Sequence, residues 1–238
     1  AGELYWFAAL VNGTLTDGTA PNTSANAVLV NDITVNTGVL TADGKLASNV
    51  SGFTEWTPIG KNNIYKIYKG TFDGQGHTVS GLYFNNSNTA CVGLFGYIDS
   101  GGKISNVGVV DSYFNGYYYV GGVCGYNKSG TISNCYHIGV VEGYLYVGGV
   151  CGDNDSESSA ISNCYHIGVV SGSSYVGGVC GVNRGSESNC YNIGAVSGYN
   201  YVGGVCGSNV GGTISNCYSA GAASGSYNVG GVIGFINT

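Results

Sequence analysis

An acidic stretch offers the most direct metal-binding chemistry in the chain. Asp153, Asp155 and Glu157 alternate with Asn154 and Ser156, so side-chain oxygen atoms follow one another along this segment. Oxygen-rich loops of this kind can hold calcium, although the glycine and the distal glutamate of an EF-hand loop are missing here. We therefore treat Asp153, Asp155 and Glu157 as a calcium candidate, but predict a hydrated loop without a metal or cofactor.

Two histidines recur at one position of neighbouring repeats. His137 and His166 would stack about 5 Å apart in a parallel sheet, which is close enough to share a metal ion. Asn192 and Ser219 take the same position in the following repeats, and no carboxylate recurs beside them. The pattern favours a solvated column of side chains that points outward.

Carboxylates that could form a catalytic pair are scattered along the chain. Glycosidases need two of them about 5 to 9.5 Å apart across a cleft. Polysaccharide lyases need a base and a positive charge to neutralise a uronate, and Arg184 is the only arginine. No two carboxylates share a repeat position among Asp73, Asp99, Asp111, Glu142 and Glu187. The sequence thus predicts a protein that is not an enzyme, with a polysaccharide-cleaving β-helix as the enzymatic alternative.

Eight of the nine cysteines fall in the repeats as pairs: Cys124 and Cys135, Cys151 and Cys164, Cys180 and Cys190, Cys206 and Cys217. The spacing within a pair is 10 to 13 residues and no CxxC occurs, so zinc is not indicated. Two arrangements stay open, a disulfide within each repeat or two columns of buried thiols. Ile233 replaces the first cysteine in the last repeat, which favours thiols acting as small apolar side chains.

Tyrosine is the residue type most suggestive of binding, with 20 copies. Two sets align between repeats: Tyr119, Tyr146, Tyr175 and Tyr201, and Tyr136, Tyr165, Tyr191 and Tyr218. Tyr117, Tyr144 and Tyr199 form a broken third column. Stacked tyrosines can simply stabilise a parallel sheet. If they are exposed, the two complete columns become candidate binding residues for a glycan or protein partner.

These side chains are positioned by a repeat of fixed length. The phrase YVGGVCG begins at Tyr119, Tyr146, Tyr175 and Tyr201, with a weaker copy at Asn228, so the offsets are 27, 29, 26 and 27 residues. A second phrase, ISNCY, alternates with the first. The apolar pieces are β-branched or aromatic, short, and bounded by Gly, Asn or Ser, which is typical of strands. A period of this size indicates coils stacked on copies of themselves.

We therefore predict an all-β fold: a single-stranded right-handed parallel β-helix (β-solenoid) of about 27 residues per coil. Three strands per coil and a triangular section are expected. Val120 and Ile132 each begin a column of side chains that is expected to point inward. An asparagine ladder is expected at a corner, formed by Asn134, Asn163, Asn189 and Asn216. The glycine pairs, such as Gly121 and Gly122, are expected at a bend or at positive φ.

The first 53 residues differ from the rest. Leu4, Phe7, Ala8 and Val11 have helical spacing and Gly13 follows as a stop signal, which predicts a short amphipathic helix. Residues 1–53 are therefore expected to cap the solenoid, and residues 54–238 to form one continuous domain. Thr71–Tyr83 is expected to contain two strands around an Asp-Gly turn.

Composition excludes several functions. The chain has 238 residues, a net charge of −6 and only seven Lys and Arg, so it lacks the clustered cations that nucleic acid binding requires. No apolar run reaches the length of a membrane span. Hydrophobic content of 43% argues against disorder.

The phrases VGGVCGYN and ISNCY resemble the GLUG motif (Gly-Leu-hydrophobic-Gly). Leu94 is closest to its leucine position, which is valine elsewhere: Val123, Val150, Val179 and Val205. Residues 56–60 and 72–77 are similar to the segment that precedes such repeats, so the resemblance covers roughly residues 54–238. It implies a large secreted or surface-anchored bacterial protein, adhesin-like, and the motif also occurs in non-catalytic regions of immunoglobulin A peptidases. It implies no catalytic residue.

The resulting prediction is a non-catalytic extracellular adhesion or binding module of a bacterial cell-surface protein, with a host or cell-surface glycan or protein as partner. A structural spacer or stalk that presents another domain is the main alternative. We expect no nucleic acid partner and no membrane span in this chain. We expect an extracellular location, either secreted or anchored at the cell surface.

Overall fold

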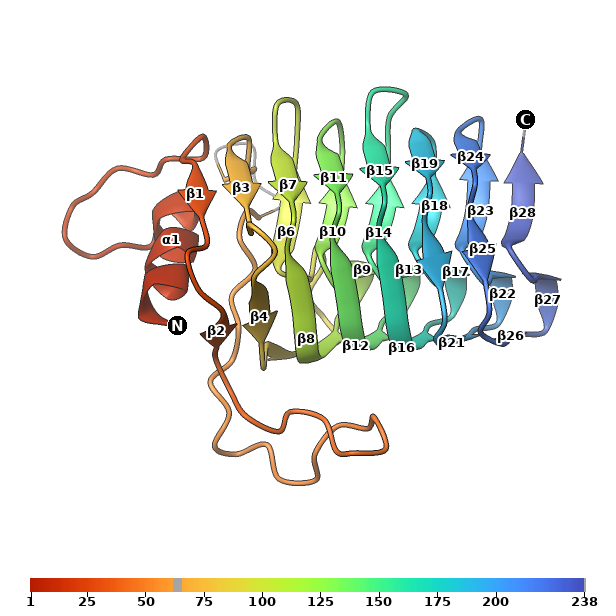
Figure 1. The fold of residues 1–238 in the computed structure, drawn as a ribbon, viewed down its shortest axis with the longest axis horizontal. Coiled ribbons are helices and arrows are strands. Elements are labelled where there is room, and N and C mark those ends of the chain that lie inside the picture. The colour runs from red at the N-terminus through yellow and green to blue at the C-terminus, as the bar shows by residue number, and fades with distance from the viewer. Residues whose placement is uncertain (62–65, 238) are drawn as a thin grey trace.

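The computed structural model describes residues 1–61 and 66–237, and shows a β-solenoid with one helix at its N-terminal end (Figure 1). Successive coils stack along one axis, and every pair of named strands is parallel, as in Ile132 opposite Ile104 and Ile161. The pairs are in register except for a shift between β8 (Gly108–Asn115) and β12 (Tyr136–Glu142) at Ile138 and Gly139. The predicted fold is confirmed. The repeat coils pass through four sheets, however, so the expected three strands per coil are wrong.

We number the four sheets in the order in which one coil passes through them. Sheet 1 contains β9 (Tyr118–Gly121), β13 (Leu145–Gly148), β17 (Ser174–Gly177), β22 (Asn200–Gly203) and β27 (Tyr227–Gly230). Sheet 2 contains β6 (Phe95–Ile98), β10 (Cys124–Asn127), β14 (Cys151–Asn154), β18 (Cys180–Asn183), β23 (Cys206–Val210) and β28 (Ile233–Asn237).

Sheet 3 contains β1 (Ala27–Val28), β3 (Thr71–Asp73), β7 (Lys103–Ser105), β11 (Thr131–Ser133), β15 (Ala160–Ser162), β19 (Ser186–Ser188) and β24 (Thr213–Ser215). The main path of sheet 4 contains β2 (Ile33–Thr34), β4 (Thr78–Ser80), β8 (Gly108–Asn115), β12 (Tyr136–Glu142), β16 (Tyr165–Ser171), β20 (Tyr191–Asn192) and β25 (Tyr218–Ser219). The strands β5 (Tyr83–Asn85), β21 (Ala195–Ser197) and β26 (Ala223–Ser224) extend it.

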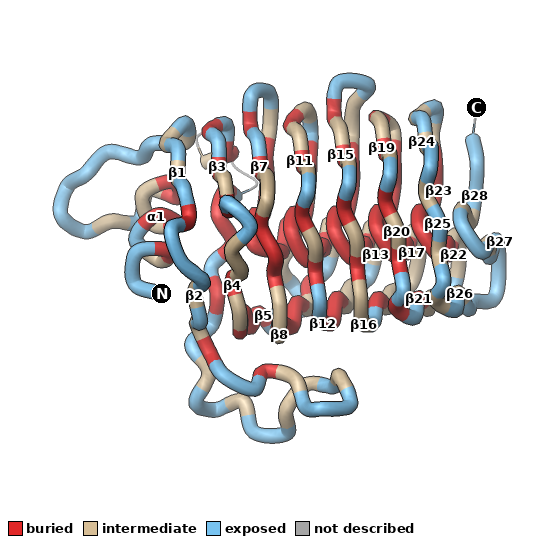
Figure 2. Tube along the Cα trace, in the orientation of Figure 1, coloured by how far each residue is buried: buried red, intermediate tan, exposed pale blue. Residues whose placement is uncertain are grey.

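The interior of the coils is mainly apolar, with a few buried polar side chains. Val120, Val147, Val176 and Val202 are fully buried, as are Ile132 and Ile161, whereas Val229 in the last coil is exposed. Figure 2 shows buried residues lining the inner side of the coils. Identical apolar residues about 4.8 Å apart along a column bury each other. The predicted inward columns are therefore confirmed.

The cysteines are free thiols, and all but Cys217 are buried. One column runs along sheet 2, where Cys124, Cys151, Cys180 and Cys206 lie opposite one another. The other follows the corner between sheets 3 and 4, where the backbone N–H of Cys135 donates to Cys164 Sγ at 3.4 Å. The structure thus has the two columns of thiols that the replacement of the first cysteine by Ile233 led us to favour.

The glycine pairs lie at a bend, but their φ angles are not in the left-handed region. The left-handed position falls on the preceding tyrosine instead, with φ of 58° at Tyr119 and 60° at Tyr146. The second glycine is needed for close approach: a Cβ on Gly149 would lie 2.4 Å from Cγ of His166 and 2.2 Å from the carbonyl oxygen of Gly178. Of the two roles expected for these glycines, the structure shows the bend and not the positive φ.

Two asparagine ladders tie the coils together. The predicted corner ladder is present, with Asn163 Nδ2 donating to Asn134 Oδ1 at 3.1 Å and Asn134 Nδ2 to Asn106 Oδ1 at 3.0 Å. The second ladder is buried at the end of sheet 2, where hydrogen bonds of 2.8 Å between side-chain amides link Asn127, Asn154, Asn183 and Asn209. In the buried ladder, each rung satisfies polar groups that would otherwise lack a hydrogen-bond partner inside the protein.

The N-terminal segment covers one end of the solenoid. The helix α1 spans Gly2–Asn12 and ends at Gly13 with φ of 62°, and its buried side chains include the four apolar residues predicted to face the core. Strands β1 and β2 add one rung each to sheets 3 and 4 (Figure 1). Val39, from the loop that follows, packs on the outer face of sheet 4 against Tyr83, Tyr113 and Val140.

Candidate functional site

The first tyrosine column, Tyr119, Tyr146, Tyr175 and Tyr201, is a stack of half-buried rings. Neighbouring centroids lie 5.0, 5.0 and 4.8 Å apart with planes within 19° of parallel. Its first ring also packs edge-on against Tyr126 at 4.8 Å. All four residues hold a left-handed backbone, which costs a bulky residue about 1–3 kcal/mol. Stacking offsets that strain, so this column has a structural role.

The second column, Tyr136, Tyr165, Tyr191 and Tyr218, lies on the outer side of sheet 4 beside the exposed asparagine corner. Its centroids are 4.8, 4.8 and 5.2 Å apart and its planes deviate by at most 7°. Each inner ring is covered on both faces by its neighbours. Among the described residues, the face of Tyr136 that looks away from Tyr165 has no aromatic partner, because Gly108 takes the preceding rung.

A shallow groove opens at that end of the column. Its volume is about 480 Å³, and it is lined by Asp73, Gln75, Gly76, Asn106, Asn134 and Tyr136. Tyr136 lies against the bare backbone of Gly108, where a Cβ would come within 2.2 Å of the ring. An aromatic ring, three side-chain amides and one carboxylate therefore meet in a single concave surface.

Hydrogen bonds fix the acidic group of the groove. Asn106 Nδ2 donates to Asp73 Oδ1 at 2.9 Å, and the backbone N–H of Gln75 donates to the same oxygen at 3.0 Å. These bonds, the Asn106 amide first, lower the pKa of the Asp73 carboxyl, so it is ionised at neutral pH. Among the described residues no donor contacts Asp73 Oδ2, which leaves this oxygen able to accept a hydrogen bond from a hydroxyl group.

The third column is the most exposed and the least regular. Tyr117 and Tyr144 stack at 5.4 Å, but Ser173 takes the next rung before Tyr199. Their relative exposures of 38%, 48% and 56% leave the rings on the surface.

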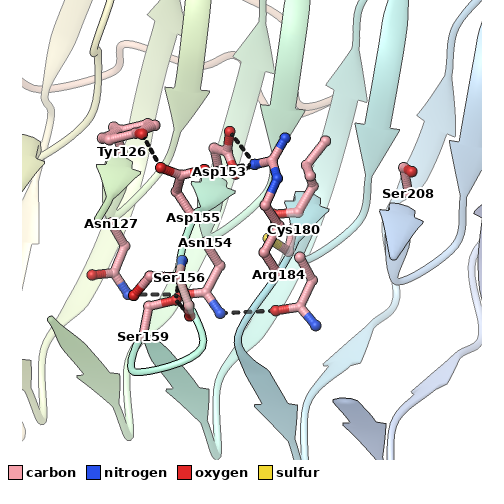
Figure 3. Close-up of polar contacts among 12 residues, drawn as sticks. Tyr126, Asn127, Asp153, Asn154, Asp155, Ser156, Ser159, Cys180, Arg184 and Ser208 are labelled. Atoms are coloured by element: carbon pink, nitrogen blue, oxygen red, sulfur yellow. Dashed lines mark hydrogen bonds and ion pairs between the residues drawn. The ribbon is translucent and has the colours of Figure 1, made fainter. Parts of the chain in front are cut away.

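The calcium candidate is an ion-pair cluster around Arg184 (Figure 3). Arg184 Nη1 lies 2.8 Å from Asp153 Oδ1 and 2.8 Å from Asp155 Oδ1, and the hydroxyl of Tyr126 donates to the other oxygen of Asp155. Burial raises the pKa of Asp153, and the guanidinium works against that rise. Glu157 lies exposed in the turn that follows. The guanidinium thus supplies the positive charge that a calcium ion would bring, and it links β14 to the residue after β18.

The histidine column points inward, so the outward arrangement predicted for it was wrong. His137 and His166 are fully buried with ring centroids 5.2 Å apart, next to the bare backbones of Gly122 and Gly149. His137 Nε2 lies 2.9 Å from Ser112 Oγ, and His166 Nδ1 lies 3.1 Å from Asn192 Oδ1. Burial lowers the pKa of His137 and lowers that of His166 to about 4, so both rings are neutral at pH 7.

The groove was only partly predicted. Tyr136 was a candidate from its repetition, and Asn134 was identified as a ladder residue. Asp73, Gln75 and Asn106 were not singled out for binding, because they lie in diverged coils where the repeat is weak. The signal that could have found them is register: Gly108 aligns with Tyr136 and so marks the place where the ring column ends.

No family model matches this chain. It is 37% identical over 76 residues to halomucin of Haloquadratum walsbyi, a match that spans 32% of this chain and 1% of halomucin. Among solved structures it is similar to a Bacteroides ovatus protein described as a "putative immunoglobulin A1 protease", with a TM-score of 0.60 and 21% identity over 82% of this chain and 68% of that one. At this identity the likeness shows a shared fold. No described helix is long and apolar enough to cross a membrane.

Proposed function

We propose that this chain is a non-catalytic, extracellular binding module that recognises carbohydrate in the groove beside Tyr136. The observation that carries the proposal is that the ring of Tyr136, which no other ring covers on the side of Gly108, lines a concave surface that also holds an ionised carboxylate and side-chain amides. A sugar ring can lay its apolar C–H face on the tyrosine, while its hydroxyls bond to Asp73, Gln75 and Asn134. Binding sites generally combine an apolar wall with a few oriented polar groups in this way.

The extracellular location rests on likeness. The repeats resemble the GLUG motif of exported bacterial proteins, and the proposal includes that these are GLUG-type repeats. One relative in fold is named for a protease of immunoglobulin A1, a substrate found outside cells, and a relative in sequence is named halomucin. A location on or outside the cell surface is consistent with both names.

The non-catalytic character rests on the groove itself. Asp73 is the one carboxylate among the residues that line it, whereas glycoside hydrolysis uses two. Asp73 is also held ionised by its donors, which suits an acceptor of hydroxyl hydrogen bonds better than a general acid.

A glycan array probed with the intact chain tests the proposal. Tyr136→Ala should weaken binding at least tenfold, or about 1.4 kcal/mol. Tyr218→Ala is the matched control, because it removes the ring at the other end of the same column, and it should bind as the unaltered chain does. Equal losses in both variants would contradict the groove, and release of reducing ends from any bound polysaccharide would contradict a non-catalytic role.

A structural spacer is the second candidate, favoured by the uninterrupted ladders. Asparagine and tyrosine stacks link successive coils along most of the solenoid, which makes a stiff rod. A spacer predicts no specific glycan signal on the array, and it predicts that Tyr→Ala changes alter only stability.

A further inference from the structure

Glu187 interrupts a column of isoleucines. It lies in β19 between Ile161 and Ile214, Ile104 and Ile132 occupy the two rungs before Ile161, and its side chain points into the solenoid. It is fully buried, and neither carboxylate oxygen has a hydrogen-bond partner among the described residues. A buried polar group without a partner costs free energy, so a carboxyl group in this place requires an explanation other than packing.

Two thiols converge on this carboxylate. An oxygen of Glu187 and the Sγ atoms of Cys190 and Cys217 all lie within 4.8 Å of one another. Cys190 follows Glu187 in the same coil, and Cys217 belongs to the next coil. The Sγ atom of Cys217 accepts a hydrogen bond from the backbone N–H of Cys190 at 3.4 Å. The group therefore combines two coils, which is why spacing within a single repeat gave no sign of zinc.

Two sulfurs and one oxygen form a ligand set suited to Zn²⁺ and Cd²⁺. At Zn–S of about 2.3 Å and Zn–O of about 2.1 Å, tetrahedral ligands lie about 3.6–3.8 Å apart. The three atoms would need to close by about 1 Å, which side-chain rotation can supply. Cys217 is only half-buried and gives an ion a route of entry.

We propose that Glu187, Cys190 and Cys217 form a binding site for a thiophilic divalent cation, Zn²⁺ or Cd²⁺. A fourth position would be open to water or to another donor. The ion would satisfy the orphaned carboxylate and would link the third and fourth YVGGVCG coils. This site is independent of the carbohydrate groove, and neither proposal rests on the other.

Binding must release protons. Burial raises the pKa of Glu187. The hydrogen bond with the Cys164 thiol and burial raise the pKa of Cys190, although its contact with Cys217 works against that rise. Contact with Cys190 and burial raise the pKa of Cys217. The other ionisable groups that influence Glu187 from across the interior are thiols of sheet 2, namely Cys151, Cys180 and Cys206. All three ligands thus hold their protons in the free protein, and one bound cation displaces up to three. Affinity should therefore rise with pH.

The test is a Cd²⁺ titration of the reduced intact chain, followed by ultraviolet charge-transfer absorption from thiolate to cadmium, with calorimetry of Zn²⁺ in two buffers to count released protons. We expect one equivalent of tight binding. Glu187→Ile restores the isoleucine column, so the variant should fold, but it should bind the ion at least tenfold more weakly. Glu187→Gln keeps the shape of the side chain and should weaken binding to the same extent.

Cys135→Ser is the matched control, since it removes a thiol of the same column beside Ile132 and away from Glu187. It should leave the affinity unchanged, whereas Cys217→Ser should reduce it at least tenfold. The proposal is overturned if the unaltered chain binds neither ion below millimolar concentration, if Glu187→Ile binds as tightly as the unaltered chain, or if Cys135→Ser lowers the affinity as much as Cys217→Ser.

Discussion

The buried histidines should make the protein sensitive to acid, and His166→Asn should remove part of that sensitivity. Asparagine already occupies the next rung at Asn192, so the replacement fits the column. Burial lowers the pKa of His166 to about 4 in the folded protein, while an unfolded chain has the ordinary value of about 6.5. The native ring must therefore stay neutral over a range in which the unfolded ring takes up a proton.

The sign and size follow from proton linkage. Above pH 6.5 neither state binds the proton and His166 has no effect on pH dependence. As the pH falls from 6.5 to about 4, only the unfolded state gains a proton, so the free energy of unfolding decreases. At about 1.4 kcal/mol per pH unit, the loss attributable to His166 is about 3 kcal/mol by pH 4.

The assay is urea unfolding at several pH values between 7 and 4, comparing the unaltered chain with His166→Asn. Titrating groups away from this column, including Glu187, are common to both proteins and cancel in the difference. His137 adds to the difference in the same direction, because His166 also lowers its pKa. The variant should lose about 3 kcal/mol less stability across this range. His77→Asn, which removes an imidazole from the surface, is the control. Parallel pH profiles for the unaltered chain and His166→Asn would refute a buried neutral imidazole.

Three further changes test the packing. Arg184→Gln leaves Asp153 buried without its cation and should destabilise the protein by about 3 kcal/mol at pH 7, measured by urea unfolding. The control is Lys128→Gln, which removes an exposed ion pair of 4.0 Å and should change the free energy of unfolding little. Gly149→Ala places a methyl group 2.2 Å from the Gly178 carbonyl oxygen and should cost about 3 kcal/mol; Gly52→Ala has nothing within 4 Å and should be neutral in the same melts. Tyr175→Ala interrupts two stacking contacts of 5.0 and 4.8 Å and should cost about 2 kcal/mol while leaving glycan binding intact; an unchanged melting curve would contradict the structural role of that column.

Much of the architecture could be predicted because repetition fixes register. Once Val120 aligns with Val147, every residue of the two repeats acquires a neighbour, and the corner asparagines and thiol columns follow directly. The first helix was equally readable from Leu4, Phe7, Ala8, Val11 and Gly13.

The direction of each side chain could not be predicted so well. His137 was expected outside because polar residues take its position in the following repeats, yet Gly122, at the bend between β9 and β10, leaves room for its ring inside. The glycine pairs were expected at a bend or in the left-handed backbone, yet the left-handed position falls on Tyr119, which the ring stack holds in that conformation. In both cases a contact with another coil outweighs the local preference of the residue.

The candidate sites lie where the repeat is broken, and this is why they could not be predicted from the repeat pattern. Gly108 ends the column at Tyr136, and Glu187 replaces an isoleucine. A pattern built from repeated residues predicts the ladders well, but a residue that departs from the repeat is interpreted only as sequence divergence.

The most direct test of the binding site is a titration of protein with ¹³C-labelled tyrosine rings, using the oligosaccharide that gives the strongest array signal. Comparison with Tyr136→Phe assigns the resonance of Tyr136. The account predicts that this resonance shifts first and furthest, while those of Tyr146 and Tyr175 stay in place. Shifts confined to the Tyr119 column, or a saturable interaction that leaves Tyr136 unmoved, would contradict it.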